Sequence, residues 1–109
     1  MKVISLFVII SSLFIFSGST LAADGGKIFT EKCSMCHGPK GAGTPMGPAM
    51  KGNEFITKGN AADMRKVILE GRTGSYKKYP KISIDMPKMP MPDADVSALI
   101  SFMQGDLQK

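Results

Sequence analysis

The 109-residue sequence predicts a small all-α domain of three or more short helices, with long loops and little or no sheet. In three segments the apolar residues recur at helical spacing, and no segment alternates between apolar and polar residues as a strand does. Stretches rich in glycine and proline separate the helical segments. Two of these loops have about 20 residues each, longer than most loops in compact domains. We therefore expect that something other than the chain fills the space between them.

The N-terminal segment has the pattern of a secretory signal peptide. Lys2 supplies a positive charge, an apolar run of 14 residues extends from Val3 to Phe16, and small residues follow as far as Ala23. The run is shorter than the ~20 residues that a membrane-spanning helix needs, although an uncleaved anchor is the alternative. Cleavage fits after Ala22 or Ala23. We expect residues 1–23 to be the signal peptide, residues 24–109 to form one domain, and the protein to be periplasmic.

The composition of the expected mature chain limits its possible functions. Its 86 residues exclude a doubly wound sheet or a barrel enzyme. It has no tryptophan and few other aromatic residues, and so sparse a core needs a disulfide, a metal or a cofactor. Without Lys2, 13 basic side chains remain against 9 acidic ones, a net charge of +4. This excess suits docking to an acidic partner but is too small to indicate nucleic-acid binding.

The three predicted helices are each marked by a start signal. They span residues 25–33, 61–70 and 94–104. Asp24, Asn60 and Asp93 precede them as N-cap candidates, and Gly71 ends the second helix. In the two long loops, residues 38–53 and 72–92, glycines and prolines exclude helix and central strand.

The segment Cys33-Ser34-Met35-Cys36-His37 is the Cys-x-x-Cys-His pattern of c-type haem attachment. Cysteines at i and i+3 lie on the same side of a helical turn, so both sulfurs can reach the vinyl groups of one porphyrin. The histidine that follows then lies beneath the iron as its proximal ligand. The pattern therefore predicts one covalently attached haem, with Cys33 and Cys36 as thioethers and His37 on the iron.

Three other interpretations of these cysteines are weaker. A Cys33–Cys36 disulfide would suit an exported protein but would leave His37 unexplained. A thioredoxin-like site needs a βαβ unit, which the sequence does not predict. A structural zinc site needs four ligands, and the chain has two cysteines and one histidine.

Beyond this motif, the sequence resembles the small bacterial class I cytochromes c over essentially all of residues 24–109. Gly25 and Phe29, before the first cysteine, match the glycine and aromatic residue at the crossing of that family's terminal helices. Leu99 and Phe102 match the apolar and aromatic pair of its last helix. The resemblance implies an all-α domain packed around one haem c, acting as an electron carrier and not as an enzyme.

Two further parts of the resemblance concern the iron ligands. The segment from Gly47 to Gly52 resembles the Gly-Pro-x-Leu-x-Gly segment of the family, which implies that the Pro48 carbonyl accepts the ring N–H of His37. A Met-Pro pair shortly before the last helix matches the family's distal ligand.

Three methionines compete for that distal role, because Met86, Met89 and Met91 are each followed by proline. His37 is the one histidine of the chain, which excludes a second histidine ligand. Relatives commonly place the ligand six to eight residues before the N-cap of the last helix. With Asp93 as that cap, the separations are 7, 4 and 2 residues. We therefore expect Met86 as the distal ligand, with Met89 as the alternative.

The loop expected on the distal side of the haem is basic, with Lys77, Lys78, Lys81 and Lys88. Around a haem edge such charges steer transient docking to acidic redox proteins. The sequence thus predicts an exported monomer that shuttles single electrons, either free or as a subunit of a larger oxidoreductase. Two alternatives are an open haem site for gas sensing or ligand binding, and Cu(I) binding by the methionine cluster, since soft thioethers select this ion.

Overall fold

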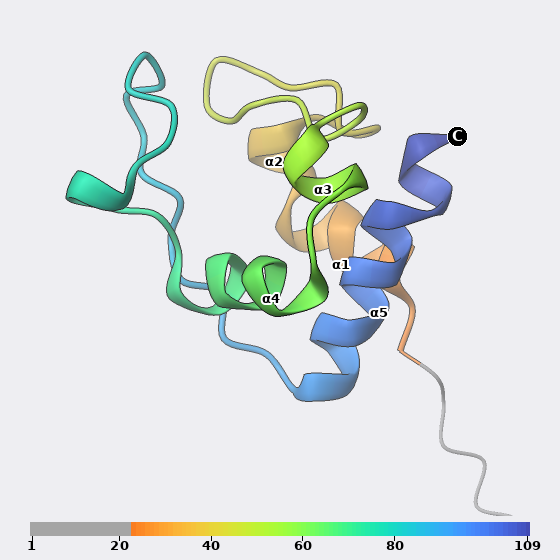
Figure 1. Cartoon of the computed structure of the whole chain (residues 1–109). Coiled ribbons are helices and arrows are strands. Elements are labelled where there is room, and N and C mark those ends of the chain that lie inside the picture. The colour runs from red at the N-terminus through yellow and green to blue at the C-terminus, as the bar shows by residue number, and fades with distance from the viewer. Residues whose placement is uncertain (1–22) are drawn as a thin grey trace, which may run out of the picture.

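The computed structural model describes residues 23–109, and Figure 1 shows the arrangement of their helices. The elements are α1 (Gly25–Lys32), α2 (Ser34–His37), α3 (Glu54–Thr57), α4 (Ala61–Glu70), η1 (Gly74–Tyr76), α5 (Asp93–Gln104) and η2 (Asp106–Gln108). Within residues 23–109 the only β-type pairing is two isolated bridges, which confirms the predicted all-α class. No helix in this part of the chain is long and apolar enough to cross a membrane. The expected signal peptide lies outside the described residues except for Ala23.

Two of the three predicted N-caps are confirmed. The Asp24 carboxylate accepts a hydrogen bond from the Lys27 amide at 3.1 Å, at the start of α1. The Asn60 side-chain oxygen accepts one from the Asp63 amide at 2.8 Å, at the start of α4. Each bond satisfies one of the N–H groups that the first turn of a helix leaves unpaired.

The prediction of Asp93 as the N-cap of the last helix is wrong. Asp93 is the first residue of α5, and Pro92, with φ −58°, takes the cap position without a side-chain hydrogen bond. The Asp93 carboxylate instead accepts a hydrogen bond from the Arg65 guanidinium at 2.7 Å, which joins α5 to α4. With Pro92 as the cap, Met86 lies six residues before it and stays within the expected interval.

The first predicted helix, residues 25–33, corresponds to α1 and ends at Cys33. This residue, with φ −115°, ends α1 and begins α2, the short helix that carries Cys36 and His37. The single turn of α3 is absent from the sequence prediction, because four residues are too few to show helical periodicity. It begins where the Asn53 side chain accepts a hydrogen bond from the Phe55 amide at 3.0 Å.

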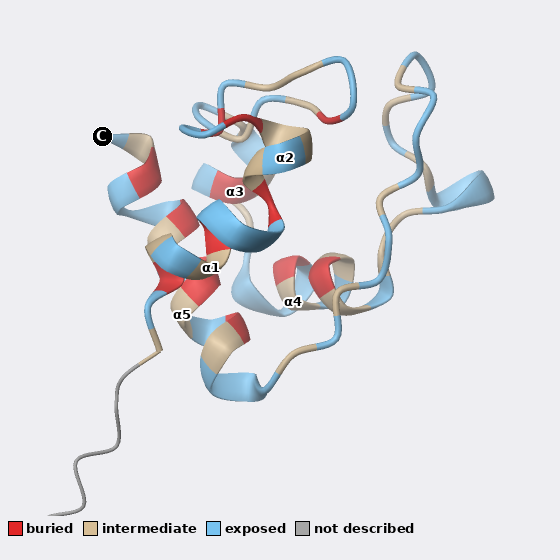
Figure 2. Cartoon of the chain, turned by 180° about the vertical axis from the view of Figure 1, so that it is seen from behind, coloured by how far each residue is buried: buried red, intermediate tan, exposed pale blue. Residues whose placement is uncertain are grey.

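The core lies where α1 crosses α5, and Figure 2 shows the buried residues on the facing sides of these helices. Gly25 makes the close crossing possible, because a Cβ atom at this position would collide with the Ala98 carbonyl of α5. The Phe29 and Phe102 rings fill the contact with their centroids 5.6 Å apart. Phe29 and Leu99 are almost completely buried. This is the helix crossing that the resemblance implies.

The remaining elements lie beside this core (Figure 1). The loop of residues 38–53 lies beyond α2, and the loop of residues 71–92 leaves the end of α4 and returns to α5. Gln108 of η2 holds the end of the loop of residues 38–53 by two hydrogen bonds. Its side-chain oxygen accepts from the Gly52 amide at 2.7 Å, and its side-chain nitrogen donates to the Met50 carbonyl at 3.1 Å.

Candidate haem site

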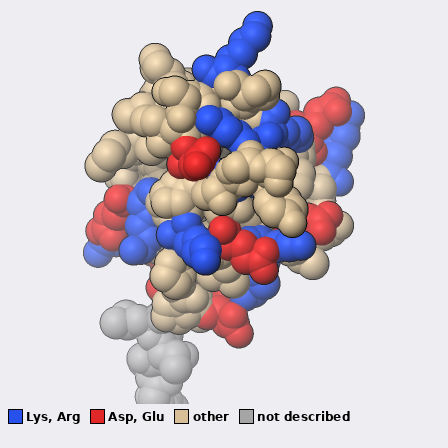
Figure 3. All heavy atoms as spheres, turned by 90° about the vertical axis from the view of Figure 1, so that its left-hand side faces the viewer, with Lys and Arg blue, Asp and Glu red and all other residues tan. Residues whose placement is uncertain are grey.

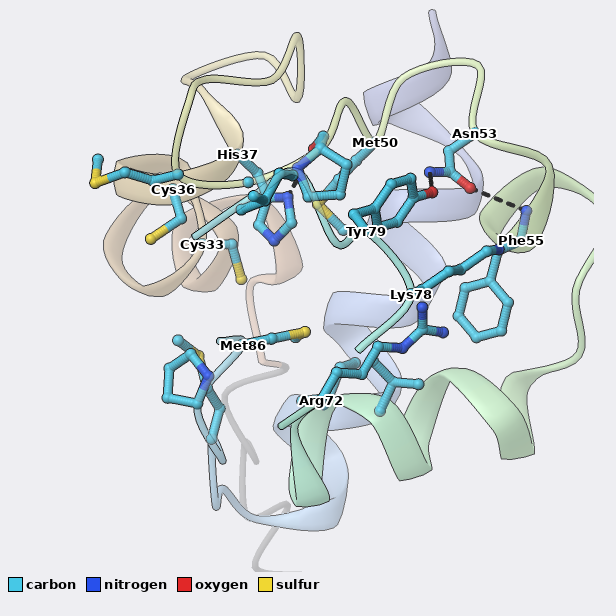
Figure 4. A pocket seen from close by; sticks show the side chains of 18 of the residues that line it. Cys33, Cys36, His37, Met50, Asn53, Phe55, Arg72, Lys78, Tyr79 and Met86 are labelled. Atoms are coloured by element: carbon cyan, nitrogen blue, oxygen red, sulfur yellow. Dashed lines mark hydrogen bonds between the residues drawn. The ribbon is translucent and has the colours of Figure 1, made fainter. Parts of the chain in front are cut away.

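A largely apolar cavity lies between α2 and the loop of residues 71–92 (Figure 4). It measures about 1080 Å³ together with the part that is open to solvent. This is at the upper end of the roughly 300–1,000 Å³ of small-molecule and cofactor pockets. Side chains of α3, α4 and α5 complete its walls. The cavity thus occupies the space that the two long loops were expected to leave.

Cys33, Cys36 and His37 line one wall of this cavity. The two cysteines are not joined by a disulfide. Burial raises the pKa of the Cys33 thiol to about 11, although the nearby charge of Lys32 partly opposes the shift. A thioredoxin-like site needs a lowered cysteine pKa, so this environment argues against that interpretation.

The His37 ring is oriented by the chain that follows α2. Its Nδ1 lies 2.8 Å from the Pro48 carbonyl oxygen, and because a carbonyl only accepts, the ring donates this hydrogen bond. The proton therefore resides on Nδ1, and Nε2 keeps a free lone pair for a metal. Gly47 allows the close approach, because a Cβ atom there would lie 2.7 Å from the Cys36 carbonyl oxygen and 3.2 Å from Nδ1.

Met86 lines the opposite wall (Figure 4). It is half-buried, and its backbone forms an antiparallel bridge with Arg72 at the end of α4. Met89 also reaches the cavity wall, but Met89 and Met91 pack against the hydrophobic core. A Cu(I) site built from the three methionines would require all three thioethers to reach one pocket. Met91 does not line the cavity, so the structure does not support such a site.

A polar group of side chains closes one end of the cavity. The Arg72 guanidinium lies 4.8 Å, and the Lys78 ammonium 5.4 Å, from the centre of the Phe55 ring. The Asn53 side-chain nitrogen donates to the Tyr79 hydroxyl at 3.3 Å. Within residues 23–109 neither Arg72 nor Lys78 has an ion-pair partner. Two unpaired cations at the end of an apolar cavity suit the carboxylates of a haem.

Sequence reasoning missed the part that Asn53 and Phe55 take in this site. Asn53 carries one signal, since an asparagine before Glu54 is a possible helix N-cap, but a single helical turn does not show which surface it faces. The sequence analysis places Lys78 in a basic loop and gives Arg72 no role, because the Phe55 ring that both cations contact lies far from them in the chain.

The four lysines expected near the haem edge differ in their surroundings. Lys78, Lys81 and Lys88 are exposed. The Lys77 side chain is only 20% exposed, and its ammonium lies 3.6 Å from the Asp85 carboxylate, so its charge is partly neutralised. Figure 3 shows that basic and acidic groups alternate with uncharged surface on the side that carries this loop.

The residues present therefore fit a covalently attached haem. Two free thiols and an oriented imidazole share one wall, a thioether lies on the other, and unpaired cations lie at one end. No group of three or more His, Cys, Asp or Glu within residues 23–109 could hold a metal ion by itself.

Comparisons with known proteins agree with this geometry. The family model for cytochrome c matches residues 22–105. The solved structure of the KustC0563 c-type cytochrome is similar, with a TM-score of 0.53 and 24% identity, over 75% of this chain and 95% of that one. Cytochrome cL from Hyphomicrobium denitrificans gives a TM-score of 0.52 and 23% identity, over 72% of this chain and 43% of that one.

At these identities the structural similarities show the fold, and the chain spans less than half the length of that cytochrome cL. No curated protein sequence matches significantly. The family assignment rests on the family model, which covers most of the chain and includes every residue that lines the cavity, from Lys32 to Met103. The chain therefore belongs to the cytochrome c family, and it is an electron-transport protein that binds haem c covalently.

Proposed function

We propose that this protein is an exported single-electron carrier, not an enzyme, whose haem is bound through Cys33 and Cys36 and ligated by His37 and Met86. The observation that supports this most directly is the opposition of two side chains across one cavity. His37 presents a free Nε2 from one wall, and Met86 presents a thioether from the other. The iron of a bound haem supplies a one-electron couple, and a thioether ligand raises its potential.

The chain's own residues keep both ligands in place. The Pro48 carbonyl holds the His37 ring, and the bridge to Arg72 holds the backbone of Met86. Apolar side chains line most of the cavity and would exclude water from around a bound haem. Fixed ligands and a dry pocket limit the rearrangement that accompanies a change of charge, which favours fast electron transfer over binding of a substrate.

The polar end of the cavity supports a specific orientation of the haem. We expect its carboxylates to face Arg72 and Lys78, with the Tyr79 hydroxyl and the Asn53 amide nearby as hydrogen-bonding groups. The Phe55 ring holds both cations near this position, so that less side-chain entropy is lost when the carboxylates bind. The opposite edge of the haem then lies toward Cys33 and Cys36.

The same function includes export and transient docking. The N-terminal pattern supports periplasmic localisation, and a monomer is the expected state of a small carrier. Lys81 and Lys88 remain the stronger candidates for steering an acidic redox protein to the haem edge, because they are exposed and form no ion pair within the described chain. Lys78 is also exposed, but the haem carboxylates that it faces would neutralise part of its charge. Lys77 contributes less charge to this surface because Asp85 neutralises part of it.

The distal ligand is tested by replacing one methionine at a time in the holoprotein. Met86→Ala should abolish the weak red absorption band from methionine sulfur to ferric iron and lower the midpoint potential, because the thioether favours the reduced iron. Met89→Ala is the matched control and should keep the band, since Met89 packs against the core.

Loss of the band in Met89→Ala alone would assign the distal role to Met89. A high-spin spectrum without the band in the unsubstituted protein would contradict methionine ligation and favour the open-site alternative. Absence of covalent haem after expression with the haem-maturation machinery would contradict the whole proposal.

A further inference from the structure

The end of α4 lies unusually close to the segment that carries Met86. Gly71, the C-cap of α4, has φ +72° and ψ −171°, a backbone conformation that essentially only glycine adopts. A Cβ atom at this position would collide with the Met86 carbonyl oxygen. It would also lie 2.9 Å from the Pro87 carbonyl carbon and 3.0 Å from the Lys88 amide nitrogen. No side chain can therefore be added at Gly71 without moving this segment.

Three backbone hydrogen bonds join the same two segments. The Arg72 amide donates to the Met86 carbonyl at 2.9 Å, and the Met86 amide donates to the Arg72 carbonyl at 3.1 Å. Three residues later, the Met89 amide donates to the Ile68 carbonyl of α4 at 2.9 Å. These bonds attach the Met86 segment to the last turn of α4.

The prolines of the segment exclude some of the other registers of this attachment. A slip of one residue would place Pro87 opposite Arg72, and proline has no N–H to donate. A slip of three residues would place Met89 opposite Arg72 but Pro92 opposite the Ile68 carbonyl, which would then lose its donor. The observed register satisfies all three hydrogen bonds, which neither of these two slips does, and it presents Met86 to the cavity.

We propose that Gly71 is a positioning residue for the distal ligand. It does not line the cavity, but its missing side chain lets the Met86 backbone lie against α4 at the distance that the hydrogen bonds require. The inference rests on the proposed function, in which Met86 is the ligand. A side chain at position 71 moves the Met86 segment away from α4 and weakens the ligation.

The test compares Gly71→Ala with two matched glycine variants of the holoprotein. Gly52 has φ +73° and Gly74 has φ +56°, so alanine is strained at each of these positions as well. Unlike Gly71, both have nothing within 4 Å of an added Cβ atom, and neither lines the cavity. A positive φ is thus common to the three variants, whereas displacement of Met86 is specific to Gly71→Ala.

Two measurements on the ferric protein report ligation directly. They are the methionine-to-iron absorption band and the affinity for added imidazole, which binds where the methionine leaves. We expect Gly71→Ala to weaken the band and to bind imidazole about tenfold more tightly or better, the change that ~1.4 kcal/mol of weaker ligation gives. Gly52→Ala and Gly74→Ala should match the unsubstituted protein in both measurements, even where their unfolding midpoints fall.

A Gly71→Ala protein that equals the two controls in band and imidazole affinity overturns the inference. If Met86 is not the ligand, Met86→Ala keeps the absorption band. Failure of the proposed function can therefore be distinguished from failure of this inference. If Gly71→Ala yields no holoprotein, amide hydrogen exchange of the unsubstituted reduced protein decides. Slow exchange at Arg72, Met86 and Met89 supports the inference, and exchange at Met86 as fast as at exposed Ser83 overturns it.

Discussion

The most constrained single side chain of the site is His37, whose ring lies against the backbone of the next loop. Its Nδ1 donates to the Pro48 carbonyl, and a Cβ atom added at Gly47 would crowd both the ring and the Cys36 carbonyl. The orientation of the imidazole therefore depends on the absence of a side chain at one position and on a backbone carbonyl at the next. Because His37 bonds to the backbone carbonyl of Pro48, the proline ring itself is not needed for this hydrogen bond.

Gly47→Ala should lower the free energy of unfolding of the holoprotein by roughly 1–3 kcal/mol, the usual effect of overpacking a tightly packed site. Gly47 does not have a positive φ, so the cost comes from the contacts of the added methyl group. Guanidinium unfolding monitored by haem absorption measures it. Pro48→Ala is the matched control, because it keeps the carbonyl that accepts from His37. A larger loss in Pro48→Ala than in Gly47→Ala would contradict this account.

The site residues that could be predicted from the sequence are those that belong to a short motif with fixed spacing. Cys33, Cys36 and His37 follow from one motif, and the hydrogen bond between His37 and Pro48 was expected from the family resemblance. The contacts of Arg72 and Lys78 with Phe55 were not predicted, since they join residues far apart in the chain. Their roles toward the haem, like those of the ligands, remain predictions for experiment.

Among the elements, the crossing of α1 and α5 provides a sharp test because two adjacent glycines differ in their surroundings. At Gly25 an added Cβ would collide with the backbone of Ala98, which belongs to a helix and cannot move alone. At Gly26 the nearest neighbour is the end of the Phe102 ring at 3.2 Å, which can shift.

Gly25→Ala should therefore destabilise the holoprotein by roughly 1–3 kcal/mol, whereas Gly26→Ala should change its stability by less than about 1 kcal/mol. Both glycines lie in the first turn of α1, so the change in helix propensity on replacing them is similar and the difference between the variants isolates the helix contact. Denaturant unfolding of the two proteins side by side gives this difference. Equal stabilities would show that α1 and α5 can move apart at little cost to accommodate a methyl group at position 25.

Helices of eight residues or more were predicted within one or two residues, because apolar spacing and capping residues act locally. The single turn of α3 and the 3-10 turns η1 and η2 were not, since short turns depend on what they pack against. The cap of α5 was assigned to Asp93 because an aspartate is favoured there. The structure gives that position to Pro92, and the carboxylate pairs with Arg65, a contact that requires α4 and α5 to be adjacent.

For the whole molecule, the size of the cavity relative to the core predicts that folding depends on the haem. The buried core contains ten side chains, and the cavity beside it is lined mostly by apolar groups. Without the haem these groups would face water, and so small a core gives little stability of its own.

The double variant Cys33→Ser/Cys36→Ser, secreted without covalent haem, should therefore lose most of the helical far-UV circular dichroism of the holoprotein. The holoprotein at equal concentration is the control, and both spectra are recorded in the same buffer. A haem-free chain that keeps the holoprotein's helicity and unfolds cooperatively would show that the crossing of α1 and α5 is sufficient for folding.

The contacts of Gln108 have a consequence for the order in which the molecule is completed. Its hydrogen bond to the Gly52 amide joins residues 56 positions apart in the chain. This bond to the loop of residues 38–53 can therefore form only after α5 and η2 have been synthesised. Synthesis proceeds from the N-terminus, and Cys33 and Cys36 therefore emerge long before the residue that closes their surroundings. During this interval the thiols are open to solvent, and the burial that raises the pKa of Cys33 in the folded chain has not yet occurred. Because the haem-free chain is not expected to fold, we expect haem attachment to come first and this closure to follow it.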